Sequence, residues 1–396
     1  MNEFDQQAFR QQVLAFVKEN APDLLPRVGT RSPENPHESA LLRTWSRQLH
    51  AAGFAGADWP VEFGGRADYQ AVEEMLVTEE LAKAKAPVAI GAGSLVAHAL
   101  LHFGSDEQKA LYLPKIRSYE HVWCQLFSEP DAGSDLASMR TTAIRDGETF
   151  VVRGQKVWST NAAFSDMGYL LARTDPSAAK HAGMSALALD MTLPGITVRP
   201  LREMTGTSDF NEVFFDDVIV PASALIGEEG NGWHIATTSL ASERAGVGAL
   251  VIRLRQNLDA LIAFARSTPA PYGTLADDPL IRQRLAKFTE RVTIATILSE
   301  AVIARRLRGE FNAADVPLTK LGFANINQDL SYMGIEIQGM RGTLATESPE
   351  ALDNGHWQDE FLYAKAYTIS GGSNEIMRNL LGERALGLPR EPKPQG

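Results

Sequence analysis

The stretch MRTTAIRDGETFVVRGQKVW, residues 139–158, places strand-forming residues on both sides of an Asp-Gly pair at positions 146 and 147. Asp-Gly between two such runs is typical of the tight turn of a β-hairpin. More short runs of this kind follow, separated by Gly, Pro and Asp: MGYLLART, SALALDM, ITVRPL and NEVFFDDVIVP, within residues 167–221. We therefore predict a central β-domain, a barrel or a sandwich, over residues 121–232.

Helical spacing dominates on both sides of this β-domain. Apolar residues recur on one helical face from Phe9 to Val17, and the first 120 residues contain several such segments. After residue 232, Leu250, Leu254 and Leu258 mark the apolar face of a long helix, and further long helices follow. The sequence predicts an α+β, mostly α, fold. We expect an N-terminal all-α domain (1–120), the β-domain, a C-terminal four-helix bundle (233–388) and a flexible tail (389–396).

Composition narrows the classes of function. The 396 residues carry a formal net charge of -11, which disfavours nucleic acid and anionic membranes as partners. No apolar run reaches the length of a membrane span, and the N-terminal segment resembles an amphipathic helix more than a targeting signal. Cys124 is the only cysteine, so an intrachain disulfide is impossible. We expect a reducing compartment, most simply the cytoplasm.

Two segments combine small and polar residues in a way that suits a ligand. FSEPDAGSDLAS, residues 127–138, can present backbone N–H groups and hydroxyls to a polar ring or a phosphate, or it can be an Asx-rich turn. GQKVWSTNAAFSD, residues 154–166, contains Trp158, which can stack on a planar cofactor or belong to the core. Each segment alone leaves both interpretations open.

Taken together and in order along the chain, these segments resemble the acyl-CoA dehydrogenase family of flavoproteins. CQLFSEPDAGSDLAS (124–138) is similar to the first signature of that family, and GQKVWSTNA (154–162) to its flavin-stacking segment. ISGGSNEIMRN (369–379) is a third resemblance at the expected distance. The family implies bound FAD, an acyl-CoA substrate and electron transfer to an electron-transfer flavoprotein. It also implies a homotetramer, or alternatively a dimer or a heterotetramer with a related chain.

The resemblance implies a set of FAD-binding residues. Those beside the isoalloxazine ring are Phe127, Ser128, Trp158 and Thr160. Those beside the pyrophosphate are Gly133 and Ser134. Ser373 and Glu375 are implied to contact the FAD of a neighbouring subunit.

The catalytic base is the point at which this sequence departs from most of the family. Most members place a Glu directly before the Gly-Ser turn, and Gly371 occupies that position here. A glycine keeps the backbone N–H that binds the thioester carbonyl, but it has no carboxylate. Some members place the base on the first long helix of the bundle, which corresponds to SLASERAG, residues 239–246. We expect Glu243 to be the base and Arg244 to orient substrate or base; a solvated helix face with a surface ion pair is the alternative.

Other functions stay open beside an acyl-CoA dehydrogenase. The glycine at position 371 also suits a non-catalytic or half-active subunit that pairs with a related chain. A related flavin enzyme that uses oxygen, such as a monooxygenase or a nitroalkane oxidase, is a further alternative. His98 and His102 have the i, i+4 spacing of a zinc site, but no third ligand is evident, so we expect helix packing or surface positions and no metal. Straight, branched and steroid-derived acyl groups all remain candidates.

Overall fold

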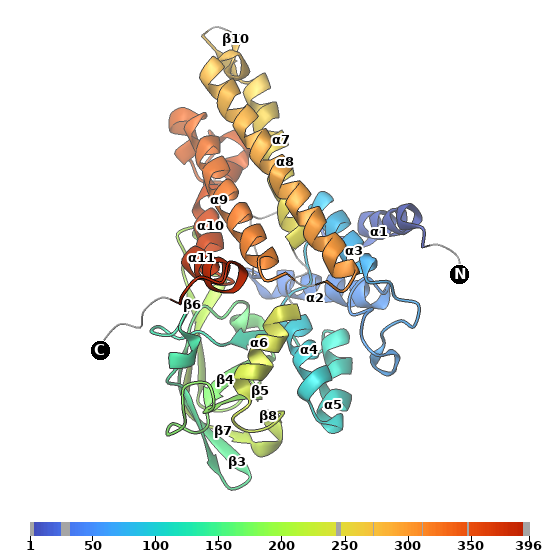
Figure 1. Ribbon diagram of the computed structural model, residues 1–396, viewed down its shortest axis with the longest axis vertical. Coiled ribbons are helices and arrows are strands. Elements are labelled where there is room, and N and C mark those ends of the chain that lie inside the picture. The colour runs from blue at the N-terminus through green and yellow to red at the C-terminus, as the bar shows by residue number, and fades with distance from the viewer. Residues whose placement is uncertain are drawn as a thin grey trace. The chain divides into compact units, whose positions relative to one another are not determined.

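The computed structural model describes residues 4–24, 32–242, 247–271, 273–310, 312–346 and 348–390 (Figure 1). The chain forms two compact units. The first contains Met1–Val77 and Ala86–Ala245, and the second contains Thr78–Lys85 and Gly246–Gly396. Each unit is described by itself.

The N-terminal part of the first unit is helical, as predicted. Its helices are α1 (Gln6–Asn20), α2 (Pro36–Ala51), α3 (Val72–Lys83), α4 (Gly93–Phe103) and α5 (Asp106–Arg117), and the last residues of α3 belong to the second unit. Polar side chains cap several of the starts. Asp5 accepts a hydrogen bond from the N–H of Ala8, and Ser105 with Gln108 forms a capping box at the start of α5. The sequence thus fixes these helix starts locally.

An eight-stranded sheet follows these helices. Its strands are β1 (Trp123–Leu126), β2 (Thr142–Asp146), β3 (Thr149–Lys156), β4 (Met167–Arg173), β5 (Met184–Asp190), β6 (Ile196–Leu201), β7 (Phe210–Pro221) and β8 (Leu225–Ile226). The predicted hairpin is formed by β2 and β3, with Asp146 opposite Thr149. Gly147 opens its two-residue turn with φ +58°, a conformation that favours glycine.

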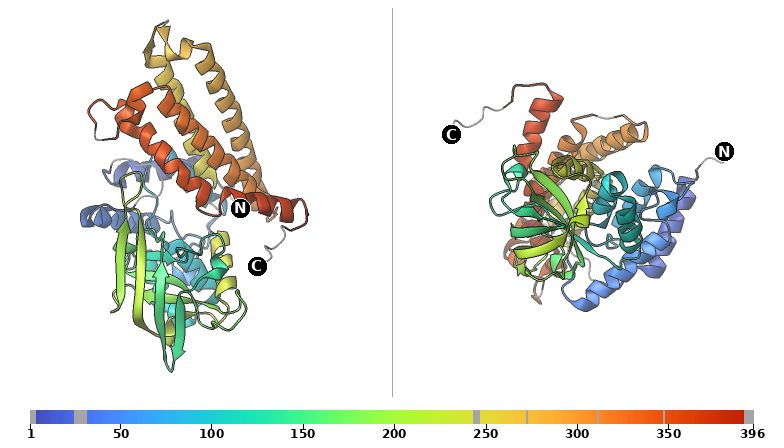
Figure 2. Two further views of the ribbon diagram at one scale, coloured as in Figure 1. Left: turned by 90° about the vertical axis from the view of Figure 1, so that its left-hand side faces the viewer. Right: turned by 90° about the horizontal axis from the view of Figure 1, so that it is seen from below.

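The sheet is open and has cores on both faces. Its order is β6-β7-β3-β2-β4-β5-β8, with β1 pairing β4, and among the described residues no pairing joins β6 to β8. The barrel alternative is therefore wrong, because the end strands do not meet. Helices α4 and α5, together with α6 (Gly232–Ser242), lie on one side of the sheet (Figure 2). Along β4, Tyr169 and Leu171 enter the core on the helical side, whereas Leu170 and Ala172 enter the core that β3 and β7 complete.

The second unit is a bundle of long helices. They are α7 (Val247–Ser267), α8 (Pro279–Leu307), α9 (Asp315–Glu336) and α10 (His356–Ile369), followed by the short α11 (Asn374–Leu380). Between α7 and α8, β9 (Pro269–Ala270) pairs with β10 (Gly273–Thr274). Helices α7 and α8 lie side by side (Figure 1). The bundle core contains the predicted leucine face of α7 at Leu254, Leu258 and Leu261, packed with Phe288 and Trp357. The mostly α fold with a central β-domain is confirmed.

Cys124, in β1, is fully buried, and burial raises the pKa of its thiol to about 12. A thiol with so high a pKa is uncharged and poorly nucleophilic at physiological pH. Among the described helices, none combines the length and apolar character needed to cross a bilayer.

His50 lies in a buried aromatic cluster and makes the first unit sensitive to pH. Its ring centroid is 5.7 Å from that of Trp59 and 5.6 Å from that of Tyr119. Burial, assisted by the positive charge of Arg117, lowers the pKa of His50 to about 4. As the pH falls below about 6.5 the unfolded chain binds this proton first, so stability present above that pH is lost toward pH 4.

We predict that the wild-type protein loses about 2 kcal/mol more of its free energy of unfolding than His50→Phe between pH 7 and pH 5. Phenylalanine keeps an aromatic ring in the cluster but cannot bind the proton. Urea titrations at both pH values measure the difference. His37→Phe, at an exposed position of the same helix, is the control and should behave like the wild type. Equal pH dependence in all three proteins would contradict the prediction.

Candidate functional site

In the first unit, the two segments that resemble a flavin site meet. The carbonyl of Ser128 accepts a hydrogen bond of 2.9 Å from the N–H of Val157, directly before Trp158. The neighbouring Phe127 is buried in the core. Glu129 and Ala132 exchange two backbone hydrogen bonds of 3.1 Å, which close a tight turn. The structure therefore brings Phe127 and Ser128, just after β1, close to the segment of Trp158, just after β3.

Beyond this turn, three consecutive backbone N–H groups are available to a ligand. Those of Gly133, Ser134 and Asp135 donate to no acceptor within the described part of the chain. A Cβ added to Gly133 would meet nothing within 4 Å, so the backbone can be approached there. Successive free amides are suited to the oxygens of a phosphate. The Asp135 carboxylate accepts from the hydroxyl of Ser138 and the ammonium of Lys180, which hold its pKa below the ordinary value.

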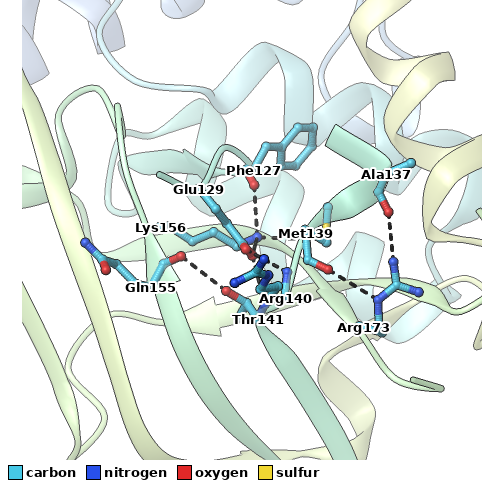
Figure 3. A network of polar contacts seen from close by, with 9 residues as sticks. All are labelled: Phe127, Glu129, Ala137, Met139, Arg140, Thr141, Gln155, Lys156 and Arg173. Atoms are coloured by element: carbon cyan, nitrogen blue, oxygen red, sulfur yellow. Dashed lines mark hydrogen bonds and ion pairs between the residues drawn. The ribbon is translucent and has the colours of Figure 1, made fainter. Parts of the chain in front are cut away.

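A buried ion pair holds this loop in place (Figure 3). Lys156, at the end of β3, is fully buried, and its Nζ donates to the carbonyl of Phe127 and to Oε1 of Glu129, both at 2.9 Å. The Glu129 carboxylate also accepts the backbone N–H groups of Arg140 at 2.6 Å and Thr141 at 2.9 Å. One lysine and one glutamate therefore fix both ends of the loop between β1 and β2.

Each charge of this pair depends on the other. Burial favours the protonated form of Glu129, but the Lys156 ammonium and the hydrogen bonds from Thr141 and Arg140 outweigh burial and hold its pKa below the ordinary value. Burial lowers the pKa of Lys156 to about 8, against the opposing effect of the Glu129 carboxylate. Removing either partner would leave an isolated charge inside the protein.

Sequence reasoning missed this pair, although a signal was present. Phe150, Val152 and Lys156 share the parity of the inward-facing positions of β3, and all three are buried. A lysine at an inward position requires a buried acceptor. The period-2 pattern therefore predicts a partner for Lys156, although it does not identify Glu129.

A second set of contacts holds the far end of the loop (Figure 3). Arg173 of β4 donates through Nη2 to the carbonyl of Ala137 at 2.8 Å and through Nε to that of Met139 at 3.3 Å. The hydroxyl of Thr141 donates to the carbonyl of Gln155 at 3.2 Å. The loop thus has a defined conformation although it is not part of a regular strand or helix.

Trp158 is displayed on the surface by an uncommon backbone conformation. Its φ is +60°, and the residue is 59% exposed, which contradicts the core alternative. Ser159 and Asn211 exchange two backbone hydrogen bonds of 3.1 Å and fix the chain directly after it. The indole meets Phe210 edge to face, with ring centroids 5.8 Å apart. An exposed indole on a fixed backbone offers a surface for stacking a planar ring.

Polar atoms beside Trp158 lack partners. The hydroxyl of Ser159 and the side-chain oxygens of Asn161 and Asn211 are buried and have no hydrogen bond to any residue that the structure describes. Thr160 is half-buried in the same segment. Unpaired buried polar atoms cost free energy, so a polar ligand edge or ordered water is expected to complete the cluster.

In the second unit, a two-glycine turn separates α10 from α11. Gly371 and Gly372 have φ values of +63° and +90°, which favour glycine at both positions. The N–H of Gly371 donates to no residue in the described ranges, and a Cβ added there would meet nothing within 4 Å. Ser373 caps α11 by accepting the N–H of Ile376 at 3.3 Å, and the side chain of Glu375 is 76% exposed. The turn thus offers an open donor where a carboxylate is absent.

Two further sets of predicted residues have different outcomes. Glu243 and Arg244 lie outside the described residues, between α6 and α7.

His98 and His102 have ring centroids 4.2 Å apart, and Nδ1 of His102 lies 2.9 Å from the carbonyl of His98. Among the described residues, no group of three or more His, Cys, Asp or Glu side chains could hold a metal ion.

The buried ion pair gives a prediction for stability. Lys156→Met should lower the free energy of unfolding by about 3–5 kcal/mol, because the Glu129 carboxylate is left buried without its cation. The double variant Lys156→Met/Glu129→Gln should lose less free energy of unfolding than the two single variants lose together, because the neutral amide oxygen still accepts a backbone N–H. Urea titration measures each variant.

The matched control is Lys180→Met, which breaks the pair with Asp135. That pair is 3.0 Å long, but its side chains are 60% and 65% exposed. The loss there should be below about 1 kcal/mol. Equal losses in the two lysine variants would show that the buried pair has no special role.

Comparison with known proteins accounts for almost the whole chain. The models of the N-terminal, middle and C-terminal domains of acyl-CoA dehydrogenases match residues 3–120, 124–218 and 230–386. Acyl-CoA dehydrogenase IpdE1 of Mycobacterium tuberculosis is 37% identical over 98% of this chain and 99% of that protein.

Solved structures agree with this assignment. The Tcur3481-Tcur3483 steroid ACAD has a TM-score of 0.87 at 29% identity and covers 98% of each chain. A chain of the ChsE4-ChsE5 complex from Mycobacterium tuberculosis has a TM-score of 0.84 at 29% identity, over 99% of this chain and 100% of that one. The protein therefore belongs to the acyl-CoA dehydrogenase family of flavoprotein oxidoreductases.

Proposed function

We propose that this chain is an FAD-dependent dehydrogenase that converts an acyl-CoA thioester to the trans-2-enoyl-CoA and passes the electrons to an electron-transfer flavoprotein. The observation that carries this proposal is the hydrogen bond between Ser128 and Val157, which directly precedes the exposed Trp158, together with the open amides of Gly133 and Ser134. In this proposal the β-domain of residues 121–232 and the bundle of residues 233–388 supply the cofactor-binding and substrate-binding groups.

The described residues fit FAD. Trp158 offers a stacking surface, and the unpaired polar atoms of Ser159 and Asn161 beside it suit a ring edge that carries donors and acceptors. The free N–H groups of Gly133 and Ser134 suit a diphosphate. Thr160 and Phe127, and from a neighbouring subunit Ser373 and Glu375, complete the proposed set. When bound, the flavin accepts the hydride equivalent that leaves the substrate β-carbon.

The chain itself supplies the groups that move and stabilise the proton and its charge. The α-proton of a thioester is too weakly acidic for a carboxylate unless the forming enolate oxygen is stabilised. The open N–H of Gly371 is the proposed donor to that oxygen, since it has no partner among the described residues. Glu243 is the proposed base, and a dry site would raise the pKa of its carboxyl and so its basicity. Arg244 is proposed to orient substrate or base.

The proposal also covers the oligomeric state of the protein and the acyl group of its substrate. Two of the structural relatives are named as complexes of two chains, and one of them as a steroid enzyme. A heteromer with a related chain is therefore the second candidate beside a homotetramer, and the glycine at position 371 favours it because the usual base is missing there. A steroid-derived acyl-CoA belongs with straight and branched chains among the candidate substrates. A cytoplasmic location stays our prediction.

Purification of the chain by itself tests the proposal most directly. We expect a yellow protein whose flavin absorbance near 450 nm is bleached anaerobically by at least one acyl-CoA of a panel with straight, branched and steroid-derived chains. Reoxidation should be slow in air and fast with an electron-transfer flavoprotein. A colourless chain that gains flavin only with a related partner would favour the subunit alternative. Rapid reoxidation in air with peroxide formation would favour an oxygen-using enzyme.

The base assignment predicts a large kinetic effect at one position. Glu243→Gln should keep FAD, yet bleach about 10²–10⁴-fold more slowly, because loss of a general base typically costs that factor. Stopped-flow absorbance under saturating acyl-CoA measures the rate. Glu148→Gln, at the exposed tip of the β2–β3 hairpin, is the matched control and should bleach like the wild type. Normal turnover by Glu243→Gln would remove Glu243 from the mechanism.

A second change in the Glu243→Gln background sharpens this test. Gly371→Glu places a carboxylate at the position that most of the family uses, where a Cβ has free space. The left-handed backbone costs about 1–2 kcal/mol for any side chain, so Gly371→Ala is the control that carries the same strain without the acid. Partial rescue by Glu but not by Ala is expected.

A further inference from the structure

A single arginine links two helices inside the second unit. Arg253 of α7 donates through Nη2 to Oε2 of Glu360 at 2.9 Å and through Nη1 to the hydroxyl of Tyr367 at 2.6 Å. Both acceptors lie on α10. The guanidinium carbon also lies 5.6 Å from the ring centroid of Tyr367. The fork of the guanidinium thus holds two positions of α10 against α7 at once.

The Arg253–Glu360 pair stays ionised although it is buried. Glu360 is fully buried. Burial opposes its charged form, but the Arg253 guanidinium outweighs burial and holds the pKa of Glu360 below its ordinary value. Glu360 alone would compensate the positive charge of Arg253. The second donor of Arg253 is directed to Tyr367, which needs no counter-charge, so this contact has a geometric effect beyond charge compensation.

Tyr367 lies one helical turn before the glycine pair. Its ring packs edge to face on Phe323 of α9, with centroids 4.9 Å apart, and on Tyr363, at 5.3 Å. With the ring fixed by these contacts and the hydroxyl fixed by Arg253, the last turn of α10 has little freedom to rotate. The direction in which the chain enters Gly371 is set by these contacts.

The exit from the turn is held as well. Asn374, the first residue of α11, donates through Nδ2 to Oδ1 of Asn325 at 3.1 Å, and its own Oδ1 accepts from Nζ of Lys320 at 3.0 Å. Both partners lie on α9. Between the end of α10 at Ile369 and the start of α11 at Asn374 lie Ser370, Gly371, Gly372 and the capping Ser373. Two consecutive glycines have wide conformational freedom, so the clamps at the ends decide where the Gly371 N–H points.

We infer that Arg253 and Tyr367 are positioning residues that aim the Gly371 N–H. The inference rests on the proposed function, in which this N–H binds the thioester oxygen. Arg253 lies on α7, the helix that begins at Val247 just after the segment of Glu243 in sequence, so it joins the two helices adjacent to the proposed base and the proposed donor. Neither residue needs to touch the substrate for this role.

Tyr367→Phe tests the inference because it removes only the hydroxyl and keeps the ring. The matched control is Tyr332→Phe, on the 55% exposed Tyr332 of α9. With an acyl-CoA that bleaches the wild type, we expect kcat of Tyr367→Phe to fall about 10- to 100-fold at unchanged KM and FAD content, since a donor out of place is lost mainly in the transition state. Arg253→Lys should act in the same direction, because an ammonium does not present the two fixed donors.

Hydrogen exchange read by mass spectrometry gives a measure that does not depend on turnover. Peptides covering residues 368–380 should exchange about five- to tenfold faster in Tyr367→Phe than in Tyr332→Phe. Absence of bleaching by the wild type with every acyl-CoA would overturn the proposed function. A wild type that bleaches, with Tyr367→Phe equal to Tyr332→Phe in kcat or in exchange, would overturn this inference alone.

Discussion

The ammonium of Lys156 is the constraint on which the candidate site of the first unit depends. A fully buried cation must be met by acceptors, and its two acceptors are the carbonyl of Phe127 and the carboxylate of Glu129. That carboxylate in turn accepts hydrogen bonds from two backbone N–H groups at the far end of the loop. The conformation of the segment between β1 and β2 is therefore imposed by electrostatics and hydrogen bonding, since no regular secondary structure spans it. The open amides of Gly133 and Ser134 belong to a loop whose two ends are held by this buried charge and its carboxylate partner.

The same physical device occurs in the bundle. There the buried carboxylate of Glu360 anchors Arg253, whose second donor reaches the end of α10. In both units an irregular segment with glycines receives its geometry from a buried ion pair. In the first unit one partner, Glu129, belongs to the loop itself, whereas in the second unit both partners lie on helices. Loops that bind ligands need exposed backbone donors, and such donors cannot be fixed by secondary structure at the same time. Long charged side chains with buried ends resolve this conflict.

Much of this architecture follows from local sequence. The hairpin around Gly147 is found where the Asp-Gly pair predicts it, and the side chains of Asp5 and Ser105 cap the starts of their helices by short-range hydrogen bonds. The proximity of Ser128 to the segment of Trp158 does not follow from periodicity, because contacts between segments far apart in the sequence are a long-range property. The open edge of the sheet has the same origin. An alternating strand pattern is compatible with both closed and open sheets, and only the pairing of the end strands distinguishes them.

The buried polar networks do not follow from local sequence. The partners Lys156 and Glu129 are separated by 27 positions in the chain, and Arg253 and Glu360 by 107. A buried position for Lys156 follows from strand parity, but the identity of its partner depends on which loop the fold brings beneath it. Gly371 is informative in a different way, because the missing carboxylate at this position favours Glu243 as the base. The φ of +63° at Gly371 is also a conformation that favours glycine over residues with a side chain.

The burial of Cys124 has a practical consequence. The chain has no other cysteine, and this thiol is fully buried with a pKa raised to about 12, so thiol-specific reagents have no target on the native protein. Cysteines introduced at the exposed positions of Glu148 and Glu290 would therefore be the sole labelling positions, without removal of the native cysteine. One of these positions lies on the sheet and the other on the bundle. Resonance energy transfer or paired spin labels could then measure the separation of the two units in solution, with and without ligand.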